Sequence, residues 1–496
     1  MMISELVAQD KDISIVELAG KLEQFVRWAA EDGECLHDVE QKILGSVLLL
    51  GRRCVDQFLR LQGDGDLGET VRTADDRMLK RSDEPSERRI RTVFGEHHFS
   101  SYTYAKGAKQ KIELRPIDAR MSLPEGEYSY LLQEFSQYFC IEEAFGRAQQ
   151  GIDKVLGQKL PVDSLERINR ALGEQAEPFL EELPKPPAKE EGELLVLTAD
   201  GKGVPMIRKD AQALPAFNAS KRRGNRRVAT LASVYSVDRY QRSAEDIVAA
   251  LFREERPTKD KDRPRPCHKH VVARFTHVEK EDGQEFIISG AHEAFCWAGE
   301  QVAQRRKRQQ PLLRLCDGQA DYPETSNAYL DEKDQDAIDI LDILHAAIYV
   351  WSATKALCGG NHEEAEPLAR DRLLRILQGQ VRGVILGLRQ MATRRELKGS
   401  PLDEVATACN YLEKNAYRMR YDEYLKEGYP IATGVIEGAC RHLVKDRMER
   451  SGMRWRLSGA APMLMLRAIQ VSNHWCKASI SSAVPATTRM TVGGMC

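Results

Sequence analysis

The chain has 496 residues, of which 42% are hydrophobic and 30% are charged, and its formal net charge is −2. Because single hydrophobic cores stop growing near ~250 to 300 residues, this length predicts several domains. No run approaches the roughly 18 apolar residues of a membrane span, and the first residues lack the basic-then-apolar pattern of a signal peptide. These features exclude a membrane-embedded or uniformly polycationic protein, and we expect a cytoplasmic protein that has no membrane partner.

The first 90 residues are expected to form a helical N-terminal region. Apolar residues recur at helical spacing in residues 12–33 and 36–63, and a polar stretch then breaks the pattern before residue 91. The eleven cysteines of the chain contain no Cys-x-x-Cys pair, which indicates reduced thiols rather than a disulfide framework. The motif CHKH, Cys267 to His270, lacks a second pair of ligands at suitable spacing, so zinc is doubtful there.

Residues 91–183 are expected to form a small hairpin followed by a helical, helix-turn-helix-like DNA-binding region. Alternation between residues 91 and 114 predicts a hairpin with its turn near Lys106-Gly107. The stretch PVDSLERINRALGEQ follows a short helix and a glycine-containing turn, and Asp163 or Ser164 is its expected N-cap. Arg167 and Arg170 then lie three residues apart, on one face, toward a DNA groove. A plain helical hairpin is an equal alternative.

The Pro-rich and charged segment 184–193 is expected to be a linker, and residues 194–330 the first part of an α/β core. Strands are predicted at residues 194–200, 225–238, 269–277 and 311–318, with a helix at residues 290–308 before the last strand. This order allows the first and fourth strands to be central neighbours. Two carboxylates, Asp200 and Asp317, would then lie at adjacent strand ends.

The rest of the chain is predicted to be mostly helical. Residues 331–429 form the expected helical region, and residues 336–357 are its strongest amphipathic segment. Residues 430–477 are expected to supply final helices, one that starts near Thr433 and one that Ser458 caps. Residues 478–496 are polar and small, and are expected to be a disordered tail.

Charge is distributed unevenly along the chain. Residues 202–227 hold eight Lys or Arg against Asp210, and residues 301–314 add five with no acid. Residues 321–342 hold eight acids against Lys333. Each cluster by itself is explained by a solvated face, but basic clusters that flank carboxylates also suit an enzyme that holds a polyanion over an acidic pocket.

Three acids have the pattern of a site for two metal ions. Two divalent cations can activate a water or a 3′ hydroxyl on one side of a phosphodiester and stabilise the leaving oxygen on the other. Magnesium prefers oxygen ligands, and Asp200, Asp317 and Glu437 are the candidates. Each acid alone is also explained as a turn residue or a solvated side chain. The glycines beside all three leave room for a close approach of a phosphate.

The same residues carry a resemblance to a known family. TADGKGVPM from Thr198, CDGQ from Cys316 and, above all, YPIATGVIEGACRHLVKDRMERSGMRW from Tyr429 resemble the DDE transposases of bacterial insertion sequences in the Kra group. The match in order covers roughly residues 91–475. The resemblance implies a multidomain α+β protein with an RNase H-like core, dependent on two Mg²⁺ or Mn²⁺ ions. It also implies cleavage and strand transfer at the ends of a mobile element.

The resemblance also implies roles for particular residues and partners. Asp200, Asp317 and Glu437 take the places of the catalytic triad, and the long interval before Glu437 implies that residues 331–429 are a helical insertion in the core. Asp342 and His345 match the Asp-x-x-His element of related transposases with such insertions, although a surface Asp and a buried neutral His explain them too. The implied partners are transposon-end and target DNA, with a homodimer or higher oligomer on DNA, nucleoid-associated in a bacterium.

Several cations are candidates for DNA contacts in addition to Arg167 and Arg170. They are Lys202, Arg222, Arg223, Arg226, Arg441, Lys445, Arg447 and Arg454. Helical periodicity places Arg441 and Lys445 on the face of Glu437. Relatives often carry cysteine pairs after the first hairpin, but residues 102–118 contain none, so zinc is doubtful in the N-terminal module as well.

Two other functions stay open at the level of the sequence. One is an RNase H-like, metal-dependent DNA nuclease, because hydrolysis and strand transfer need the same metals. The other is a noncatalytic DNA-binding protein derived from a transposase, which the three intact carboxylates argue against. A transposase that binds the terminal inverted repeats of an insertion sequence is the function we expect first.

Overall fold

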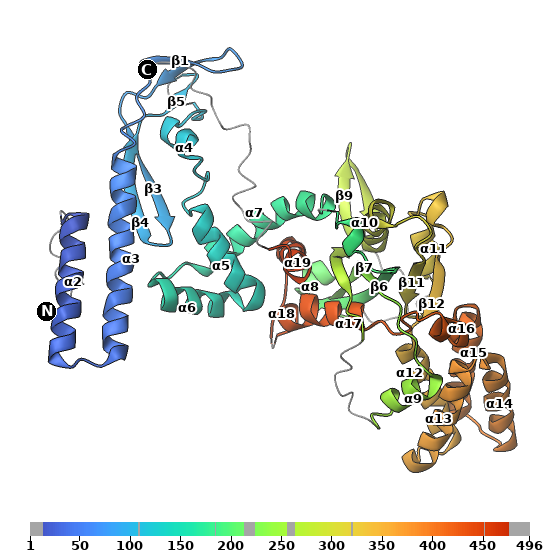
Figure 1. Ribbon diagram of the computed structural model, residues 1–496. Helices are drawn as coiled ribbons and strands as arrows, with labels where there is room; N and C mark the ends of the chain where they lie inside the picture. Colours follow the sequence, from blue (N-terminus) through green and yellow to red (C-terminus); the bar gives the residue numbers. More distant parts are fainter. Residues whose placement is uncertain are drawn as a thin grey trace. The chain divides into compact units, whose positions relative to one another are not determined.

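The computed structural model describes residues 13–107, 110–183, 185–212, 224–254, 263–318, 321–450 and 452–475 (Figure 1). The chain divides into two compact units, residues 1–169 together with 478–496, and residues 170–477, which we call the core unit. The predicted tail at 478–496 and the basic residues Arg222 and Arg223 lie outside the described residues. Among the residues described, we find no helix that is long and apolar enough to cross a membrane.

The first unit begins with the two helices that the apolar spacing predicts. The Ser14 hydroxyl accepts the Glu17 N–H at the start of the first helix, and Gly33 ends that helix in the left-handed conformation, with φ 74°. The second helix begins three residues after this glycine. The two helices are α2 (Ile15–Asp32) and α3 (Leu36–Arg60).

Small antiparallel sheets follow these helices, and here the predicted hairpin is wrong. The turn lies at Val93-Phe94 rather than at Lys106-Gly107, because the first strand starts earlier, in the stretch that was expected to be an irregular break. The side chains of Arg88, Ile90 and Thr92 point toward the less exposed face of this strand, and the charged residues between them obscure the alternation in the sequence. The strands are β1 (Thr70–Arg72), β2 (Met78–Arg81), β3 (Ser86–Thr92), β4 (Gly95–Ser101) and β5 (Tyr104–Ala105).

Short helices complete the first unit, as predicted. The helix of the helix-turn-helix candidate starts at Val162, so neither Asp163 nor Ser164 precedes it as an N-cap. Asn169 on this helix donates a buried hydrogen bond to Gln137, whose own amide donates to the Leu165 carbonyl. The helices are α4 (Pro116–Met121), α5 (Tyr130–Glu142), α6 (Phe145–Leu156) and α7 (Val162–Glu181).

The end of the expected linker packs against other residues of the core unit. Glu191, which follows the short helix η1 (Ala188–Glu190), forms a buried ion pair with Arg305 at 2.8 Å. Lys307 donates to the Glu191 carbonyl, and Gln310 donates to the Gly192 carbonyl. The division of the chain into units therefore falls inside α7 rather than in the Pro-rich segment.

A five-stranded mixed sheet forms the centre of the core unit. Its strand order is β12-β11-β6-β7-β8; the pairs β6/β7 and β7/β8 are antiparallel, and β6/β11 and β11/β12 are parallel. The first and fourth predicted strands are thus direct neighbours. The strands are β6 (Leu194–Pro205), β7 (Arg226–Val237), β8 (Cys267–Phe275), β11 (Leu312–Cys316) and β12 (Ile338–Leu341).

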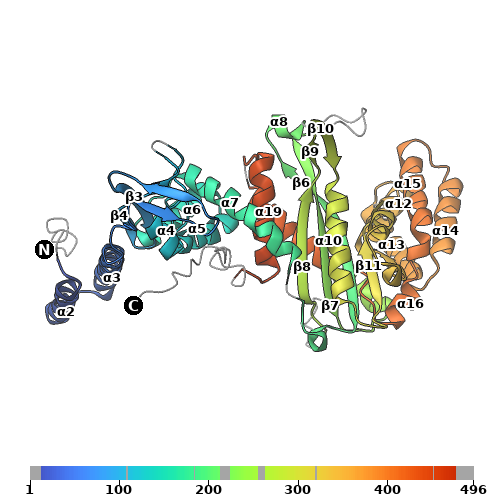
Figure 2. The ribbon, with the colours of Figure 1, turned by 90° about the horizontal axis from the view of Figure 1, so that it is seen from above.

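Further elements surround this sheet (Figure 2). Helix α10 packs on β7 and β8, and α19 packs on β8. The last helix begins at Leu457, one residue before the predicted cap Ser458, and its first N–H donates to Asp210 at 2.7 Å. These elements are α8 (Arg208–Ala211), α9 (Ala244–Leu251), β9 (His277–Glu281), β10 (Gln284–Ile288), α10 (Gly290–Arg305), α11 (Asp321–Asn327), η2 (Glu332–Asp334) and α19 (Leu457–Val471).

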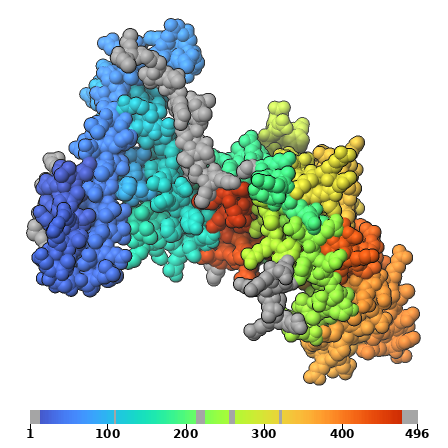
Figure 3. All heavy atoms as spheres, viewed as in Figure 1, coloured from blue at the N-terminus to red at the C-terminus, as the bar shows by residue number. Residues whose placement is uncertain are grey.

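Along the chain, a helical body follows β12 and precedes the last helices. Its atoms, coloured orange, gather at the lower right of Figure 3. It shares one hydrophobic core with the sheet, because Leu313 and Ile340 of the strands belong to the same buried cluster as Ala346 and Leu373 of the helices. The predicted helical segment 336–357 is wrong over its first residues, which form β12. The helices are α12 (Ile343–Leu357), α13 (His362–Leu377), α14 (Val381–Arg394), α15 (Ser400–Asn415), η3 (Ala416–Arg418) and α16 (Tyr421–Lys426).

The chain then returns to the sheet through a helix of changing geometry. Helix α17 (Gly434–Ala439) begins after Thr433, as the sequence predicts, and packs against β6 and β7. It continues as a π-helix, η4 (Cys440–Lys445), and then as α18 (Asp446–Met448). Single π-helical turns inside α-helices often occur at functional sites.

Candidate acidic site at the edge of the sheet

Asp200 lies at the position where the sheet loses one strand. It pairs in register with Leu231 of β7, and β6 continues beyond it to Pro205, so Asp200 does not end its strand as expected. The neighbour on the other side, β11, stops at Cys316, which pairs with Ala199. From Asp200 onward β6 therefore has no β11 residue beside it.

Asp317 directly follows the end of β11, just as Asp200 follows Ala199, the β6 residue that pairs with Cys316. Both side chains are partly buried. The residue after it, Gly318, is required for a reason that differs from the one expected. A Cβ there would lie 2.3 Å from the hydroxyl oxygen of Tyr411, so the glycine makes room for this ring rather than for a phosphate. Tyr411 stacks on Tyr349 with centroids 3.7 Å apart.

Glu437 lies in the first turn of α17 and is exposed to solvent. Its N–H donates to the Thr433 carbonyl at 3.0 Å. Desolvation raises the pKa of the Glu437 carboxyl, and the nearby charges of Asp342 and Asp200 raise it further, against the lowering effects of His345 and Thr433. On balance these surroundings disfavour the charged form of the carboxyl, and a nearby cation would favour that form.

Cys440, on the same helical stretch, connects Asp200 to α17. Its thiol donates to the Asp200 carboxylate at 3.2 Å, and burial together with the Asp200 charge holds the pKa of the thiol far above its usual range. The second Asp200 oxygen accepts the Gly201 N–H at 2.6 Å. Sequence reasoning did not single out Cys440, although its position three residues after Glu437 was a signal that it shares that face.

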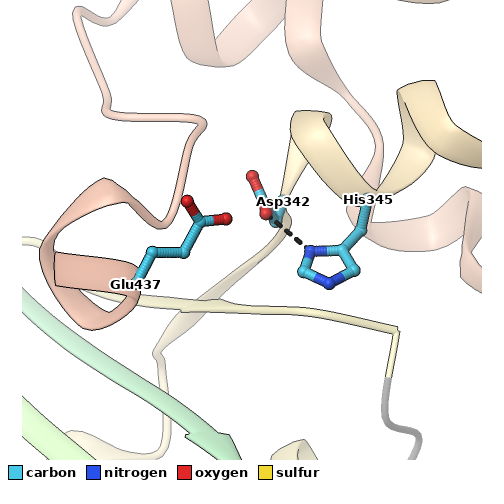
Figure 4. A group of neighbouring side chains, drawn as sticks. All are labelled: Asp342, His345 and Glu437. Atoms are coloured by element: carbon cyan, nitrogen blue, oxygen red, sulfur yellow. Dashed lines mark hydrogen bonds and ion pairs between the residues drawn. The ribbon is translucent and has the colours of Figure 1, made fainter. Parts of the chain in front are cut away.

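Asp342 and His345 join the site from the neighbouring strand (Figure 4). Asp342 caps α12 instead of lying within a helix, and its side chain is completely buried. His345 Nδ1 donates to Asp342 Oδ2 at 2.8 Å. This bond, opposed by burial and helped by the charges of Asp342, Asp317 and Asp200, raises the pKa of the imidazole. The two side chains lie next to each other because Asp342 caps the helix that carries His345.

The candidate ligand groups differ in the distances between their ligand atoms. Within the described part of the chain, ligand atoms of Asp342, His345 and Glu437 all lie within 4.8 Å of one another. Asp200, Asp317 and Glu437 do not form such a set in that part of the chain, although the electrostatic influence of Asp200 and Asp317 reaches His345.

The predicted DNA-contact residues divide into three groups. Lys202 is partly buried two residues after Asp200, and Arg226 pairs with Glu449 at 2.6 Å. Arg447 is completely buried and lies 4.9 Å from the Trp455 ring centroid, so it packs in the core instead of facing solvent. The third group is exposed and comprises Arg167, Arg170, Arg441, Lys445 and Arg454.

The π-helix changes one expectation about these cations. Arg441 and Lys445 were assigned to the face of Glu437 on the basis of 3.6 residues per turn. A π-helical stretch over Cys440–Lys445 has more residues per turn, so that spacing no longer places all three on one line. Both cations are nevertheless exposed, and Arg441 has 71% of its side chain in solvent.

The motif CHKH does not form a metal cluster. His270 is buried, with Nδ1 bonded to Gln301 at 2.7 Å and Nε2 3.2 Å from His474 Nε2, whereas Cys267 is exposed. Neighbouring residues of a strand point to opposite faces, which separates Cys267 from His268. Among the residues that the structure describes, the only group with metal-ligand spacing is the one around Glu437.

Comparisons with known proteins give little additional information. No family model matches the chain, and no curated protein matches it. The chain is similar to a solved structure, the Drosophila P element transposase strand transfer complex, with 11% sequence identity, 71% of this chain and 80% of that chain covered, and a TM-score of 0.24. A TM-score this low does not assign a fold or a function to the chain.

Proposed function

We propose that the chain is a metal-dependent enzyme of the DDE transposase kind, with an RNase H-like core that the helical body of residues 343–426 interrupts. The topology of the sheet supports this assignment of the core. Along the chain come three antiparallel strands, a helix and two strands parallel to the first, and their order in the sheet is β12-β11-β6-β7-β8. Open α/β sheets bind ligands beyond strand ends where the order reverses. Asp200 and Asp317 lie at such a position.

The observation that carries the proposal is the register of β6 and β11. Ala199 pairs with Cys316 at the end of β11, so Asp200 and Asp317 each follow a paired residue of two adjacent parallel strands, although over a hundred residues separate them in the sequence. Helix α17 packs on β6 and brings a third carboxylate, Glu437, whose pKa responds to the charge of Asp200. These three acids come from separate segments of the chain. Bringing like charges toward one another does not improve packing, because their mutual repulsion destabilises the fold.

The donor set fits hard divalent cations. The candidates are carboxylate oxygens that are partly or fully open to solvent. When bound, two Mg²⁺ or Mn²⁺ ions supply Lewis-acid activation of the attacking oxygen and stabilisation of the leaving oxygen. Asp200, Asp317 and Glu437 would hold them. Lys202, two residues after Asp200, and the exposed Arg441 would hold DNA phosphates against the repulsion of these carboxylates.

The proposal is tested with the full chain and DNA that carries the ends of the element from which the gene comes. We expect cleavage that requires Mg²⁺ or Mn²⁺, and joining of precut ends to a target plasmid. Asp200→Asn, Asp317→Asn and Glu437→Gln should each abolish both reactions while end binding stays measurable. Cleavage without joining would identify a nuclease, and binding without any cleavage would identify a noncatalytic DNA-binding protein.

A further inference from the structure

Asp342 is a carboxylate near the site whose two oxygens both accept hydrogen bonds. Its side chain has no solvent exposure. Oδ1 accepts the N–H groups of Leu344 at 3.1 Å and of Thr433 at 3.3 Å. Oδ2 accepts His345 Nδ1 at 2.8 Å and the Thr433 hydroxyl at 2.7 Å. Four donors use the roughly four lone-pair positions of a carboxylate, so no position is left for a metal ion in this arrangement.

The same residue connects two of the proposed metal ligands. Its backbone N–H donates to the Cys316 carbonyl at 3.0 Å, directly before Asp317. Its carboxylate holds both the N–H and the hydroxyl of Thr433, which precedes α17. The Thr433 carbonyl in turn accepts the Glu437 N–H at 3.0 Å. A continuous series of hydrogen bonds therefore runs from the end of β11 to the helical turn that carries Glu437.

These contacts also close the helical body at its base. The chain leaves the sheet at Asp342 and returns at Thr433, and the Ile343 N–H donates to the Ile431 carbonyl at 2.9 Å. Glu437 follows this closure by one helical turn. Without it, the position of α17 relative to β11 would depend on ninety residues of intervening chain, where small displacements accumulate. A shift of about 1 Å in a catalytic group is enough to cost roughly 10²-fold in rate.

We propose that Asp342 and Thr433 are positioning residues, which fix Glu437 relative to Asp317 without touching metal or DNA themselves. This inference rests on the proposed function, because it assumes that Glu437 and Asp317 hold the same ions. The Thr433 hydroxyl has one hydrogen, and its 2.7 Å distance assigns that hydrogen to Asp342. Glu437 Oε1, at 3.5 Å from the same oxygen, is held through the helix backbone and not by the hydroxyl.

The test measures Mn²⁺ binding to the full chain by electron paramagnetic resonance, and cleavage in parallel. Thr433→Val keeps the shape of the side chain and removes the hydroxyl, and Asp342→Asn replaces one acceptor oxygen. Both are expected to weaken Mn²⁺ binding by about 10- to 100-fold, the usual effect of losing an outer-shell partner. Thr433→Ser should restore binding to within about threefold of the wild type, since it restores the hydrogen bond.

Thr354→Val is the matched control. Thr354 is completely buried in α12 of the same helical body, and its hydroxyl donates only to the Trp351 carbonyl of its own helix. This variant has the same chemistry and a similar packing effect, and it should bind Mn²⁺ like the wild type. A similar loss in Thr354→Val and Thr433→Val would indicate general loosening of the helical body and would overturn the positioning role.

The remaining outcomes separate the two proposals. Normal Mn²⁺ binding in Thr433→Val and Asp342→Asn overturns the positioning role even if cleavage confirms the proposed function. Loss in Asp342→Asn with none in Thr433→Val makes Asp342 a ligand and overturns it as well. If Mn²⁺ binds and depends on Asp317 and Thr433 but no DNA is cut, the positioning role stands and the proposed function fails. Absence of Mn²⁺ binding at Asp317 in the wild type overturns both.

Discussion

Strand β11 and the residue after it carry two charges in different surroundings. In the middle of the strand, Arg314 is buried and donates to the Asp339 carboxylate at 2.9 Å, the Pro323 carbonyl at 2.9 Å and the Ser326 hydroxyl at 2.8 Å. Three residues later, Asp317 is partly buried, and its charge acts together with that of Asp342 on both His345 and Tyr411. Burial of a charge is tolerated where partners compensate it. Neighbouring positions of one segment can thus meet opposite electrostatic surroundings, an acidic partner at Arg314 and a second acid close to Asp317.

The largest expected effect lies at Asp317. Asp317→Asn should lower the rate of metal-dependent DNA cleavage by roughly 10³-fold or more, because metal stabilisation of the transition state is worth several kcal/mol. The free energy of unfolding should stay equal or rise, since one of several like charges is removed. Single-turnover cleavage and urea unfolding of the same preparation measure both. Lower stability in the variant would mean that Asp317 is a compensated, structural residue.

Substitution of Arg314 should have the opposite effect on stability. Arg314→Met removes the cation and leaves Asp339 beside a hydrophobic core, which should lower the free energy of unfolding by about 3 kcal/mol. This is the low end of the usual range, because Asp339 keeps 20% exposure. Adding Asp339→Leu should recover part of the loss. Equal stability of the wild type and the single variant, measured by urea unfolding, would contradict the structural role of the pair.

A buried group that the fold holds neutral gives the next effect. Burial is the first cause that lowers the pKa of His270 from 6.5 to about 4; Gln301 raises it, whereas Arg305 and His474 lower it further. The folded pKa lies below the unfolded one, so the contribution is complete above about pH 6.5 and is lost as the pH falls toward 4.

At pH 5 this linkage should cost about 2 kcal/mol relative to neutral pH. The measurement is urea unfolding between pH 7.5 and 5, compared with His270→Gln, which cannot titrate. Parallel pH profiles of the two proteins would show that His270 does not carry the dependence.

A smaller effect should distinguish the carboxylates by their response to metal. At a tenfold excess over its dissociation constant, Mg²⁺ should stabilise the core unit by about 1.4 kcal/mol. Asp317→Asn should remove this gain. Asp331→Asn, at a carboxylate that is 58% exposed, should keep it. Thermal shifts with and without Mg²⁺ give the comparison, and an equal shift in both variants would place the ion elsewhere.

The smallest effect is expected at a compensated but exposed charge. Arg226 keeps 50% of its side chain in solvent while it pairs with Glu449. Arg226→Ala should therefore change the free energy of unfolding by less than about 1 kcal/mol. If Arg226 contacts a DNA phosphate, the slope of log affinity against log salt should fall by about 0.9. An unchanged slope in a binding titration would leave Arg226 as a purely structural partner of Glu449.

Strongly periodic segments were predictable, and segments with mixed signals were not. The strands β6, β7, β8 and β11 follow from their apolar runs, because each strand buries such a run. The helices α2 and α3 follow from apolar spacing, although only Leu18 and Ala29 of α2, and Ser46 and Leu59 of α3, are buried among the described residues. The strand β12 was predicted as helix, since IDIL continues into the apolar run of α12 and only Asp342 marks the change. The hairpin β3/β4 was misplaced because charged residues on its open face masked the alternation.

The candidate site shows the same division. Sequence alone determined which residues are candidates: Asp200, Asp317 and Glu437 by residue type, neighbouring glycines and the family resemblance, and Asp342 with His345 by the resemblance of their motif. Only the tertiary structure decided their surroundings, through the β6/β11 register, the burial of Asp342 and of Arg447, and the contact of Cys440 with Asp200. The reason is physical: residue type and local spacing are written in the chain, whereas burial and long-range hydrogen-bond partners exist only after distant segments pack together.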